Sequence, residues 1–300
     1  MAEISKGKLV ENPVLSQPGA VLAGILEACR ERRPRVHCIT NYVTVNDVAQ
    51  MTLAAGGSPV MTDEPLEAED IVLLCQALAC NIGTPSERML DAMLRAGRVA
   101  NRAGLPVVLD PVGAGASAFR NRVLATLLEQ VRFAVIKGNA SEIKYLASGV
   151  GAAAGVDVAE GDCITADNAG CFADLASRLA EKTGAAVVVT GPVDVVAHPD
   201  TGRFAVHSGT SAMGRVSGTG CMGTAVLAAF AGASPDRSMG EVALAGICAM
   251  DMAGEKAETM LGAEVCAMPG GAPGSFRMHL LDAMAGLSEE ELRRARITAL

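Results

Sequence analysis

The sequence contains no tryptophan, two tyrosines and six phenylalanines in 300 residues. Hydrophobic residues still make up 50% of the chain, so the core must consist mainly of alanine, valine, leucine, isoleucine and methionine. Small side chains imply close packing between helices and a sheet, because protein interiors are nearly as dense as organic crystals. Length alone would accommodate two domains, but a single large α/β domain also reaches this size.

The chain has no excess of positive charge either, because its formal net charge is -8 at pH 7. Nucleic acids and anionic membrane surfaces normally bind a basic face, so we expect neither as a partner. An anionic substrate would have to be bound by positive charge gathered at one place.

The nine cysteines are odd in number, are scattered along the chain and include no Cys-x-x-Cys pair. This pattern argues against a disulfide framework or a zinc cluster and favours small core thiols in a reducing compartment. Residues 1–19 lack the apolar run of a secretory signal, and the uncharged run 216–235 is broken by glycines. We therefore predict a soluble, cytoplasmic protein without a membrane span.

Strand-like apolar runs alternate with helical segments along the chain, which predicts a parallel sheet covered by helices on both faces. We expect strands at 36–39, 58–61, 77–82, 106–109, 133–136 and 186–190. We expect helices at 18–33, 47–55, 64–76, 86–103, 119–130, 165–182, 238–260, 275–284 and 288–297, and further helices after Lys137–Glu142 and after Gly218.

Two segments, 193–197 and 203–207, are joined by a short turn and predict an antiparallel hairpin at the edge of this sheet. The Gly- and Ala-rich stretch 148–161 is expected to be a surface excursion. No internal repeat or linker is visible. We predict that residues 1–300 form a single domain, with 1–18 as a polar extension.

The loop Gly218-Thr219-Gly220-Cys221 runs directly into an apolar, alanine-rich segment. A helix that starts here leaves several backbone N–H groups unpaired at one point, which favours an anion site. Cys221 would lie in the first helical turn and face the bound group. The alternative interpretation is an ordinary glycine-rich loop before a core helix.

Polar residues follow the successive predicted strands, and in a doubly wound sheet they all emerge at the edge that binds ligands. They are found in 41–46, 81–84, 110, 137–142, 190–191 and the loop at Gly218. Together they supply two acids (Asp110 and Glu142), one cation (Lys137) and a helix N-terminus aimed at an anion. This inventory matches phosphoryl transfer with Mg²⁺, although Asp110 alone could equally be a helix cap or a loop brace.

Eight short motifs follow one another along the chain: Ile39-Thr40-Asn41, Ser58-Pro59-Val60-Met61, Asn81-Ile82-Gly83-Thr84, Leu109-Asp110-Pro111-Val112-Gly113, Lys137-Gly138-Asn139-Ala140-Ser141-Glu142-Ile143, Val189-Thr190-Gly191, Gly218-Thr219-Gly220-Cys221-Met222 and Pro273-Gly274-Ser275-Phe276. In these motifs the chain resembles the hydroxyethylthiazole kinases of thiamine biosynthesis, which belong to the ribokinase-like superfamily. The resemblance covers roughly residues 20–287, and the motifs occur in the family's order. It implies a three-layer ribokinase-like fold with a mostly parallel central sheet.

Residue by residue, the resemblance implies that Asn139 and Glu142 organise Mg²⁺ and the phosphates, with Asp110 nearby on the metal side. ATP would be bound by Lys137, Thr190 and Gly191, as well as by Asn139. Many relatives have arginine where this chain has Lys137, which offers a point charge instead of a fork of donors.

For the substrate, the resemblance implies that Met61 and Gly218 contact the thiazole. Asn41, Val43 and Gly83 would line the same pocket as weaker candidates.

Cys221 holds a position that is usually aspartate in the wider superfamily, where the carboxylate takes the proton of the substrate hydroxyl. The resemblance implies that Cys221 positions or deprotonates the hydroxyethyl group, while the amides of Gly218, Thr219, Gly220 and Cys221 stabilise charge on the γ-phosphoryl group. A thiol is a weaker proton acceptor unless its surroundings favour the thiolate. The alternative is that Cys221 is only a small residue needed for packing.

We therefore predict an ATP- and Mg²⁺-dependent kinase that phosphorylates the hydroxyl of 4-methyl-5-(2-hydroxyethyl)thiazole. One alternative is a nucleotide-dependent hydrate dehydratase on the same fold, which should carry Asp at the position of Cys221. Another is a non-catalytic nucleotide-binding sensor, which should lose Asn139, Glu142 or the glycine loop. The resemblance also implies a homotrimer whose thiazole pocket lies between subunits.

Overall fold

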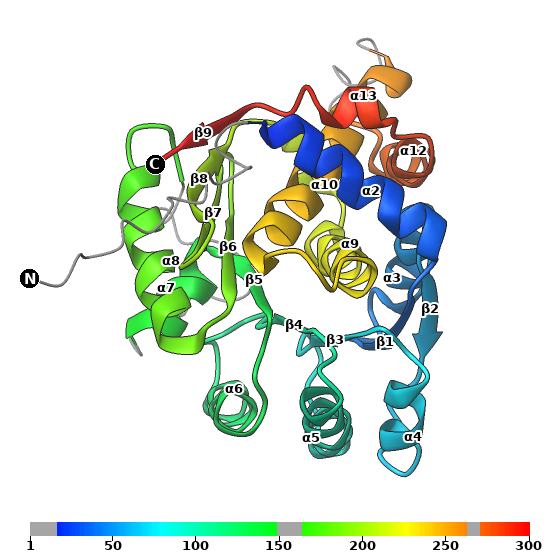
Figure 1. Cartoon of the computed structure of the whole chain (residues 1–300), viewed down its shortest axis with the longest axis vertical. Helices are drawn as coiled ribbons and strands as arrows, with labels where there is room; N and C mark the ends of the chain where they lie inside the picture. The colour runs from blue at the N-terminus through cyan, green and yellow to red at the C-terminus, as the bar shows by residue number, and fades with distance from the viewer. Residues whose placement is uncertain (1–16, 149–163, 263–270) are drawn as a thin grey trace, which may run out of the picture.

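A nine-stranded sheet covered by helices on both faces makes up the centre of the protein (Figure 1). The structure, a computed structural model, describes residues 17–148, 164–262 and 271–300. The order of the strands is β2-β1-β3-β4-β5-β6-β7-β8-β9. Their bounds are β1 (Arg35–Ile39), β2 (Ser58–Met61), β3 (Ala77–Asn81), β4 (Val107–Asp110), β5 (Val135–Asn139), β6 (Ala186–Thr190), β7 (Asp194–His198), β8 (Gly202–Val206) and β9 (Ile297–Ala299).

The first six strands pair in parallel, and β7, β8 and β9 follow as antiparallel neighbours. The mostly parallel sheet predicted from the alternation of elements is therefore confirmed. The chain runs outward from β1 to β2 and then returns to β3 on the other side of β1. Loops leave β1 and β3 in opposite directions at this switch point, and such a point opens a crevice beyond the carboxyl ends of the strands.

Helices α4 to α8 cover one face of the sheet, and α2, α3, α9, α10 and α12 cover the other (Figure 1). The helices are α2 (Pro18–Arg32), α3 (Val45–Ala54), α4 (Ala68–Leu73), α5 (Glu87–Arg102), α6 (Ala118–Gln130), α7 (Ala140–Ser148), α8 (Ala169–Thr183), α9 (Thr219–Ala233), α10 (Met239–Leu261), α12 (Pro273–Ala285) and α13 (Glu289–Leu292), with a 3₁₀ helix η1 (Ser211–Arg215). Of the described helices, none is long and apolar enough to cross a membrane.

Alternate residues of each strand enter opposite cores, because successive side chains of a strand point to opposite faces. In β3, for example, Ala77 and Ala79 pack in the core under α9, whereas Leu78 and Cys80 pack in the core under α5. A strand that is buried on both faces has apolar residues at successive positions, which explains the continuous apolar runs in the sequence. Five cysteines are buried here, as expected for small core thiols: Cys29, Cys38, Cys75, Cys80 and Cys248.

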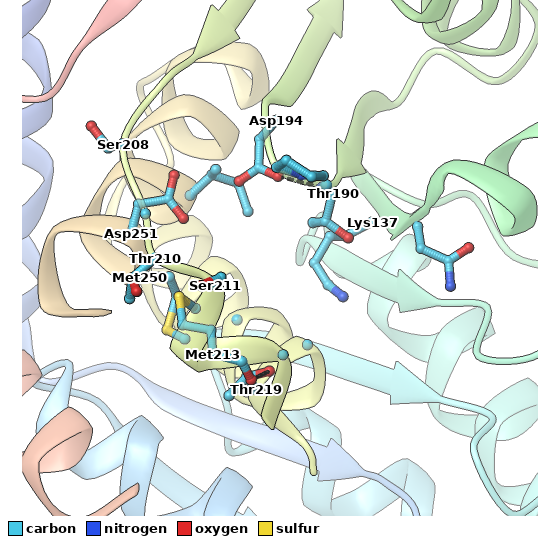
Figure 2. Close-up of a pocket in the computed structure, with 18 residues that line it drawn as sticks. Lys137, Thr190, Asp194, Ser208, Thr210, Ser211, Met213, Thr219, Met250 and Asp251 are labelled. Atoms are coloured by element: carbon cyan, nitrogen blue, oxygen red, sulfur yellow. Dashed lines mark hydrogen bonds between the residues drawn. The ribbon is translucent and has the colours of Figure 1, made fainter. Parts of the chain in front are cut away.

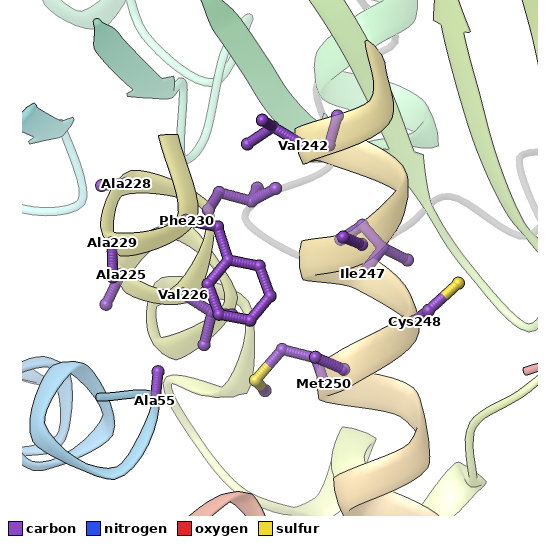
Figure 3. Packing of buried hydrophobic residues seen from close by; sticks show 14 of the residues in the cluster. Ala55, Ala225, Val226, Ala228, Ala229, Phe230, Val242, Ile247, Cys248 and Met250 are labelled. Carbon is purple, nitrogen blue, oxygen red and sulfur yellow. The ribbon is translucent and has the colours of Figure 1, made fainter. Parts of the chain in front are cut away.

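Helix α9 is apolar on all sides because it lies between the sheet and α10. Figure 3 shows Phe230 of α9 facing α10, with Val242, Ile247 and Met250 around it. The two helices approach closely at Gly246, where an added Cβ would lie 2.6 Å from Leu227 Cδ2. The close packing that the small-residue composition predicts is thus present where α9 is fixed in place.

The end of the chain differs from the sequence prediction. A helix expected over 288–297 is wrong, because α13 ends at Leu292 and β9 pairs antiparallel with β8 through Ala205 and Thr298. The predicted hairpin of β7 and β8 is present, but β9 and not the hairpin forms this edge. The pairing is a tertiary contact, also fixed by the Leu300 N–H bond to Arg203 O at 3.0 Å, so local helix propensity does not decide it.

Two further boundaries are corrected. Helix α4 spans only Ala68–Leu73 instead of 64–76, because the residues before it form turns with Glu64 accepting from the Leu66 N–H. Strand β5 continues to Asn139, so Lys137 lies in the strand and not in the loop that follows. Most of the predicted excursion 148–161 and almost all of the extension 1–18 lie outside the described residues.

Candidate active site

Cys221 lies in the first turn of α9 and faces the carboxyl ends of β1 and β3. Its Sγ accepts hydrogen bonds from Asn41 Nδ2 at 3.3 Å and from Asn81 Nδ2 at 3.2 Å. The two amides also bind each other, since Asn41 Nδ2 donates to Asn81 Oδ1 at 3.0 Å. The sulfur therefore has a defined position between two strand ends that are far apart in the sequence.

Asp110, at the end of β4, is joined to this cluster through the same amide. Its Oδ2 accepts from Asn81 Nδ2 at 2.7 Å and from Thr224 Oγ1 at 2.8 Å, and it lies 3.5 Å from Lys137 Nζ. Within the described part of the chain, the hydrogen bonds of the carboxyl group all go to Oδ2. The other oxygen, Oδ1, is left with its lone pairs for a ligand.

Lys137 is almost fully buried, with 3% of its surface exposed. Burial by itself lowers the pKa of the ammonium group, but the negative charges of Asp110 and Glu142 outweigh this effect, so the pKa of Lys137 is raised. The side chain therefore stays charged. It supplies the buried positive charge that the overall negative chain needs for an anionic ligand.

Glu142 and Asn139 bind each other around the start of α7. Glu142 Oε2 accepts from the Asn139 N–H at 2.7 Å, and Asn139 Oδ1 accepts from the Glu142 N–H at 2.9 Å. Glu142 Oε1 accepts from the Gly113 N–H at 2.8 Å. Burial and the nearby charge of Asp110 raise the pKa of Glu142 to about 7, against the opposing effect of these hydrogen bonds.

The N-terminus of α9 points into the same site. Gly218 is its N-cap residue with φ of +91°, and an added Cβ would lie 2.5 Å from Thr44 Cγ2, so only glycine fits. The N–H groups of Thr219, Gly220 and Cys221 have no acceptor within the described residues, as expected for the first turn of a helix. A Cβ at Gly220 would lie 3.4 Å from Lys137 Nζ, so these donors and the ammonium group converge.

A cavity of about 450 Å³ opens on the far side of Lys137 (Figure 2). One wall carries Lys137, Asn139, Thr190, Gly191, Thr219 and Gly220. The opposite wall belongs to α10 and the segment before α9, with Ile247, Met250, Asp251 and residues 208–211, 213 and 214. The four residues that the resemblance assigns to ATP thus line one cavity next to the helix N-terminus.

The residues expected around the thiazole do not all lie in one place. Asn41 belongs to the cluster, and the Gly83 N–H donates to Asn81 Oδ1 at 2.9 Å. Met61 ends β2 and packs, partly buried, against the core next to β1. Val43 lies in the loop after β1 with 62% of its surface exposed, and the structure does not bring it into the cluster.

The sequence does not predict the roles of three residues of the site. Asn81 is part of a polar strand end and of a family motif, but the sequence assigns it no role, although it connects Cys221 to Asp110. Thr224 is a polar residue within an apolar helix. Arg120 donates to Ile82 O, Val112 O and Gly83 O at 2.7 to 2.8 Å and so joins the loops after β3 and β4; nothing in the sequence distinguishes it from a surface arginine.

The surroundings of Cys221 disfavour ionisation of its thiol. Burial and the charge of Asp110 raise its pKa, whereas Thr44, Lys137 and Asn81 lower it and do not compensate. Cys221 is therefore a neutral thiol at neutral pH. The N-terminus of α9 and Lys137 do not produce a free thiolate by themselves.

A doubly wound sheet with two carboxylates, a buried lysine and a helix N-terminus at its ligand-binding edge defines a phosphotransferase of ribokinase-like architecture. The comparison with known proteins agrees with this class. A solved structure described as a ribokinase-like superfamily protein from Enterococcus faecalis has a TM-score of 0.56 and 12% identity, covering 90% of this chain and 95% of that chain. At that identity the likeness concerns the fold alone.

The model of the hydroxyethylthiazole kinase family matches residues 26–290. Hydroxyethylthiazole kinase from Desulfovibrio desulfuricans is 52% identical over 268 residues, covering 88% of this chain and 93% of that protein. The structure of the hydroxyethylthiazole kinase protein from Pyrococcus horikoshii OT3 has a TM-score of 0.80 and 34% identity, covering 94% of this chain and 99% of that chain. The chain belongs to the hydroxyethylthiazole kinase family.

Proposed function

We propose that the protein transfers the γ-phosphoryl group of ATP to the hydroxyl of 4-methyl-5-(2-hydroxyethyl)thiazole, with Mg²⁺, in the biosynthesis or salvage of thiamine. The observation that carries the proposal is the position of Cys221. It lies between the polar ends of β1 and β3 on one side and, on the other, the first turn of α9, which lines the cavity with Lys137. A substrate hydroxyl and a triphosphate can meet at this point.

The nucleotide occupies the cavity in this proposal, with its phosphates at Lys137, Thr190 and the N-terminus of α9. The amides of Thr219, Gly220 and Cys221 have no acceptor in the part of the chain that the structure describes, and they are fixed before the substrate arrives. Donors held in place in this way stabilise the charge that spreads over the γ-phosphoryl oxygens, at no cost of reorganisation. The new O–P bond forms in line as the bond to the β–γ bridging oxygen breaks.

The residues present fit a Mg²⁺ ion. Asp110 Oδ1 has no partner among the described residues, and each oxygen of Glu142 accepts one N–H bond from them. Magnesium is usually held by one or two carboxylates, with phosphate oxygens and waters completing the shell. No described group of three or more His, Cys, Asp or Glu could hold a metal alone, which accords with such a shared shell. The ion would neutralise phosphate charge when bound.

Cys221 positions the hydroxyl in the neutral thiol form. Asn41 and Asn81 fix the sulfur, and the S–H group is left to contact the oxygen of the substrate. The raised pKa of Cys221 argues against a thiolate that waits to take the proton.

Gly83, Met61 and Gly218 remain proposed contacts of the thiazole ring. All three lie at or near the carboxyl edge of β1, β2 and β3 and the start of α9. Val43 can take part only if another subunit covers it.

We also propose a homotrimer with the thiazole pocket at the subunit interface. Two large side chains are exposed in the loop after β1, where Tyr42 is 78% and Val43 62% exposed. Leu66, in the segment between β2 and α4, is exposed as well. Exposed apolar groups beside a site commonly mark an interface. Sedimentation equilibrium tests the trimer, and Val43→Asp should weaken both assembly and thiazole binding.

The two alternatives are less well supported. Family membership and the presence of Cys221 count against a hydrate dehydratase, and Asn139, Glu142 and the glycine loop are all retained, unlike in the sensor hypothesis. The decisive experiment follows transfer of labelled γ-phosphate from ATP to the thiazole alcohol, with pyrimidine and sugar alcohols as competitors. No transfer to any alcohol, by folded protein with Mg²⁺, would defeat the proposal.

A further inference from the structure

Two carboxyl groups that the proposed mechanism does not use lie in the wall of the large cavity. Asp194 begins β7, Asp251 lies in α10, and each is only 6% exposed. Figure 2 shows both at the same end of the pocket, with Asp251 on the wall opposite Lys137. Two buried acids in a cavity that is proposed to hold a polyanion require an explanation.

The hydrogen bonds of the pair are incomplete. Asp194 Oδ1 accepts from the Gly191 N–H at 2.7 Å. Asp251 Oδ2 is buried and has no donor among the described residues. Buried polar oxygens nearly always have a partner, and an unpaired one costs free energy, so this oxygen indicates a missing donor.

The charged groups around the pair do not neutralise it. Lys137 is paired with Asp110, and Arg296 is paired with Glu255, which also accepts from the Gly209 N–H at 2.9 Å. Burial raises the pKa of Asp194 to about 6 and that of Asp251 well above its usual range, and Cys248 nearby is a neutral thiol. The two carboxyl groups also share a side-chain hydrogen bond, which requires one proton between them, so we assign the pair one negative charge.

We propose that Asp194 and Asp251 form a nucleoside-recognition site that accepts hydrogen bonds from neutral donor groups of the bound nucleotide. The donor is a ribose hydroxyl or the exocyclic amine of the base. This inference rests on the proposed placement of ATP in the cavity. Ile247, Met250 and Pro192 beside the pair supply the apolar surface that a nucleoside needs.

The pair also orients the nucleotide along the cavity. Positive charge and free N–H groups lie at Lys137 and the start of α9, and negative charge lies at Asp194 and Asp251. A triphosphate that entered in the reverse direction would face the two acids. Correct orientation brings the γ-phosphoryl group to Cys221 and a neutral donor to the oxygens of the pair.

The size of the effect follows from the unpaired acceptor. Leaving a hydrogen-bonding group unsatisfied costs enough to reduce affinity by about 10- to 100-fold. Removal of the correct donor from the nucleotide should therefore weaken binding by that factor. Removal of a group that does not face the pair should have little effect.

The experiment measures calorimetric binding of four nucleotides to the full chain: ATP, ITP, which lacks the exocyclic amine, 2′-deoxyATP and 3′-deoxyATP. Asp251→Leu removes both acceptor oxygens. Asp251→Asn keeps one acceptor oxygen and donates to Asp194 as the protonated acid does. Thr190→Val, at the phosphate wall, is the control for occupancy of the cavity.

We expect the wild type to lose about 10- to 100-fold in affinity for one of the three analogues, which identifies the donor as amine or hydroxyl. The Leu variant should bind ATP and that analogue equally, and the Asn variant should keep the preference. No preference in the wild type, or an unchanged preference in the Leu variant, overturns the inference. If Thr190→Val also leaves the binding of every nucleotide unchanged, the placement of ATP itself is wrong.

Discussion

Replacement of Asn81 by leucine tests whether the site works as one connected network. The amide makes four hydrogen bonds: it donates to Asp110 Oδ2 and Cys221 Sγ, and it accepts from Asn41 Nδ2 and the Gly83 N–H. A bond to a charged group contributes roughly 2 kcal/mol, each neutral N–H···O bond about 1 kcal/mol and the sulfur bond less. Asn81→Leu should therefore lower the free energy of unfolding by about 4 kcal/mol.

Thr224→Val is the matched control, because Thr224 also donates to Asp110 Oδ2 but does not contact Cys221. It removes one charge-assisted bond and should cost about 2 kcal/mol. Turnover should separate the two variants further. Loss of Asn81 frees Cys221 and Asp110 together, and a displacement of about 1 Å in a catalytic group lowers turnover by about 100-fold.

Chemical denaturation gives the stabilities, and the transfer of labelled phosphate to the thiazole alcohol gives kcat and KM. The rate of alkylation of Cys221, followed by mass spectrometry, should rise in Asn81→Leu and stay unchanged in Thr224→Val. Equal effects of the two variants on kcat and on alkylation would refute the network, because they would show that support of Asp110 alone matters.

Three further predictions concern single features of the site. Cys221→Asp should retain or raise turnover, and Cys221→Ala should lower it; complete loss in a folded Asp variant that binds both substrates would contradict the role of Cys221. Because the folded pKa of Glu142 is about 7, its carboxylate is ionised only above that pH, so kcat/KM should fall as pH drops through about 7. Added Mg²⁺ should move this limb to lower pH by favouring the ionised form, and a limb that does not respond to Mg²⁺ would exclude Glu142. Gly218→Ala should lower the melting temperature, since left-handed backbone costs a non-glycine residue about 1–2 kcal/mol before the clash with Thr44. Gly214→Ala, whose added Cβ meets nothing within 4 Å, should be nearly neutral, and equal losses in both variants would contradict this account.

Much of the fold could be predicted from the sequence because its signals are local. Apolar runs such as 186–190 are strands buried on both faces, and the glycine at 218 marks the start of α9. The polar residues at the strand ends could be assigned to one edge because parallel strands share a direction. This argument places residues at an edge but does not say which side chains touch.

What could not be predicted depends on contacts between distant segments. Strand β9 forms because β8 offers an unpaired edge, and the local sequence at 297–299 carries no strand pattern that requires it. Thr224 and Arg120 acquire their roles only through partners in other elements. The same holds for Asp194 and Asp251, which meet because α10 crosses beside β7.

The surroundings of Cys221 show which interactions would favour and which would oppose a carboxylate at this position. A carboxylate would gain two amide donors from Asn41 and Asn81, each worth about 1.5–3 kcal/mol as a hydrogen bond to charge. The N-terminus of α9 would add about 0.3–1 kcal/mol. Two terms oppose a carboxylate: burial, which is the larger cause of the raised pKa of the thiol, and the negative charge of Asp110, which Lys137 partly offsets. The amide donors and the helix N-terminus favour an aspartate here, burial and Asp110 oppose it, and the thiol differs by leaving the pocket less negative before ATP and Mg²⁺ bind.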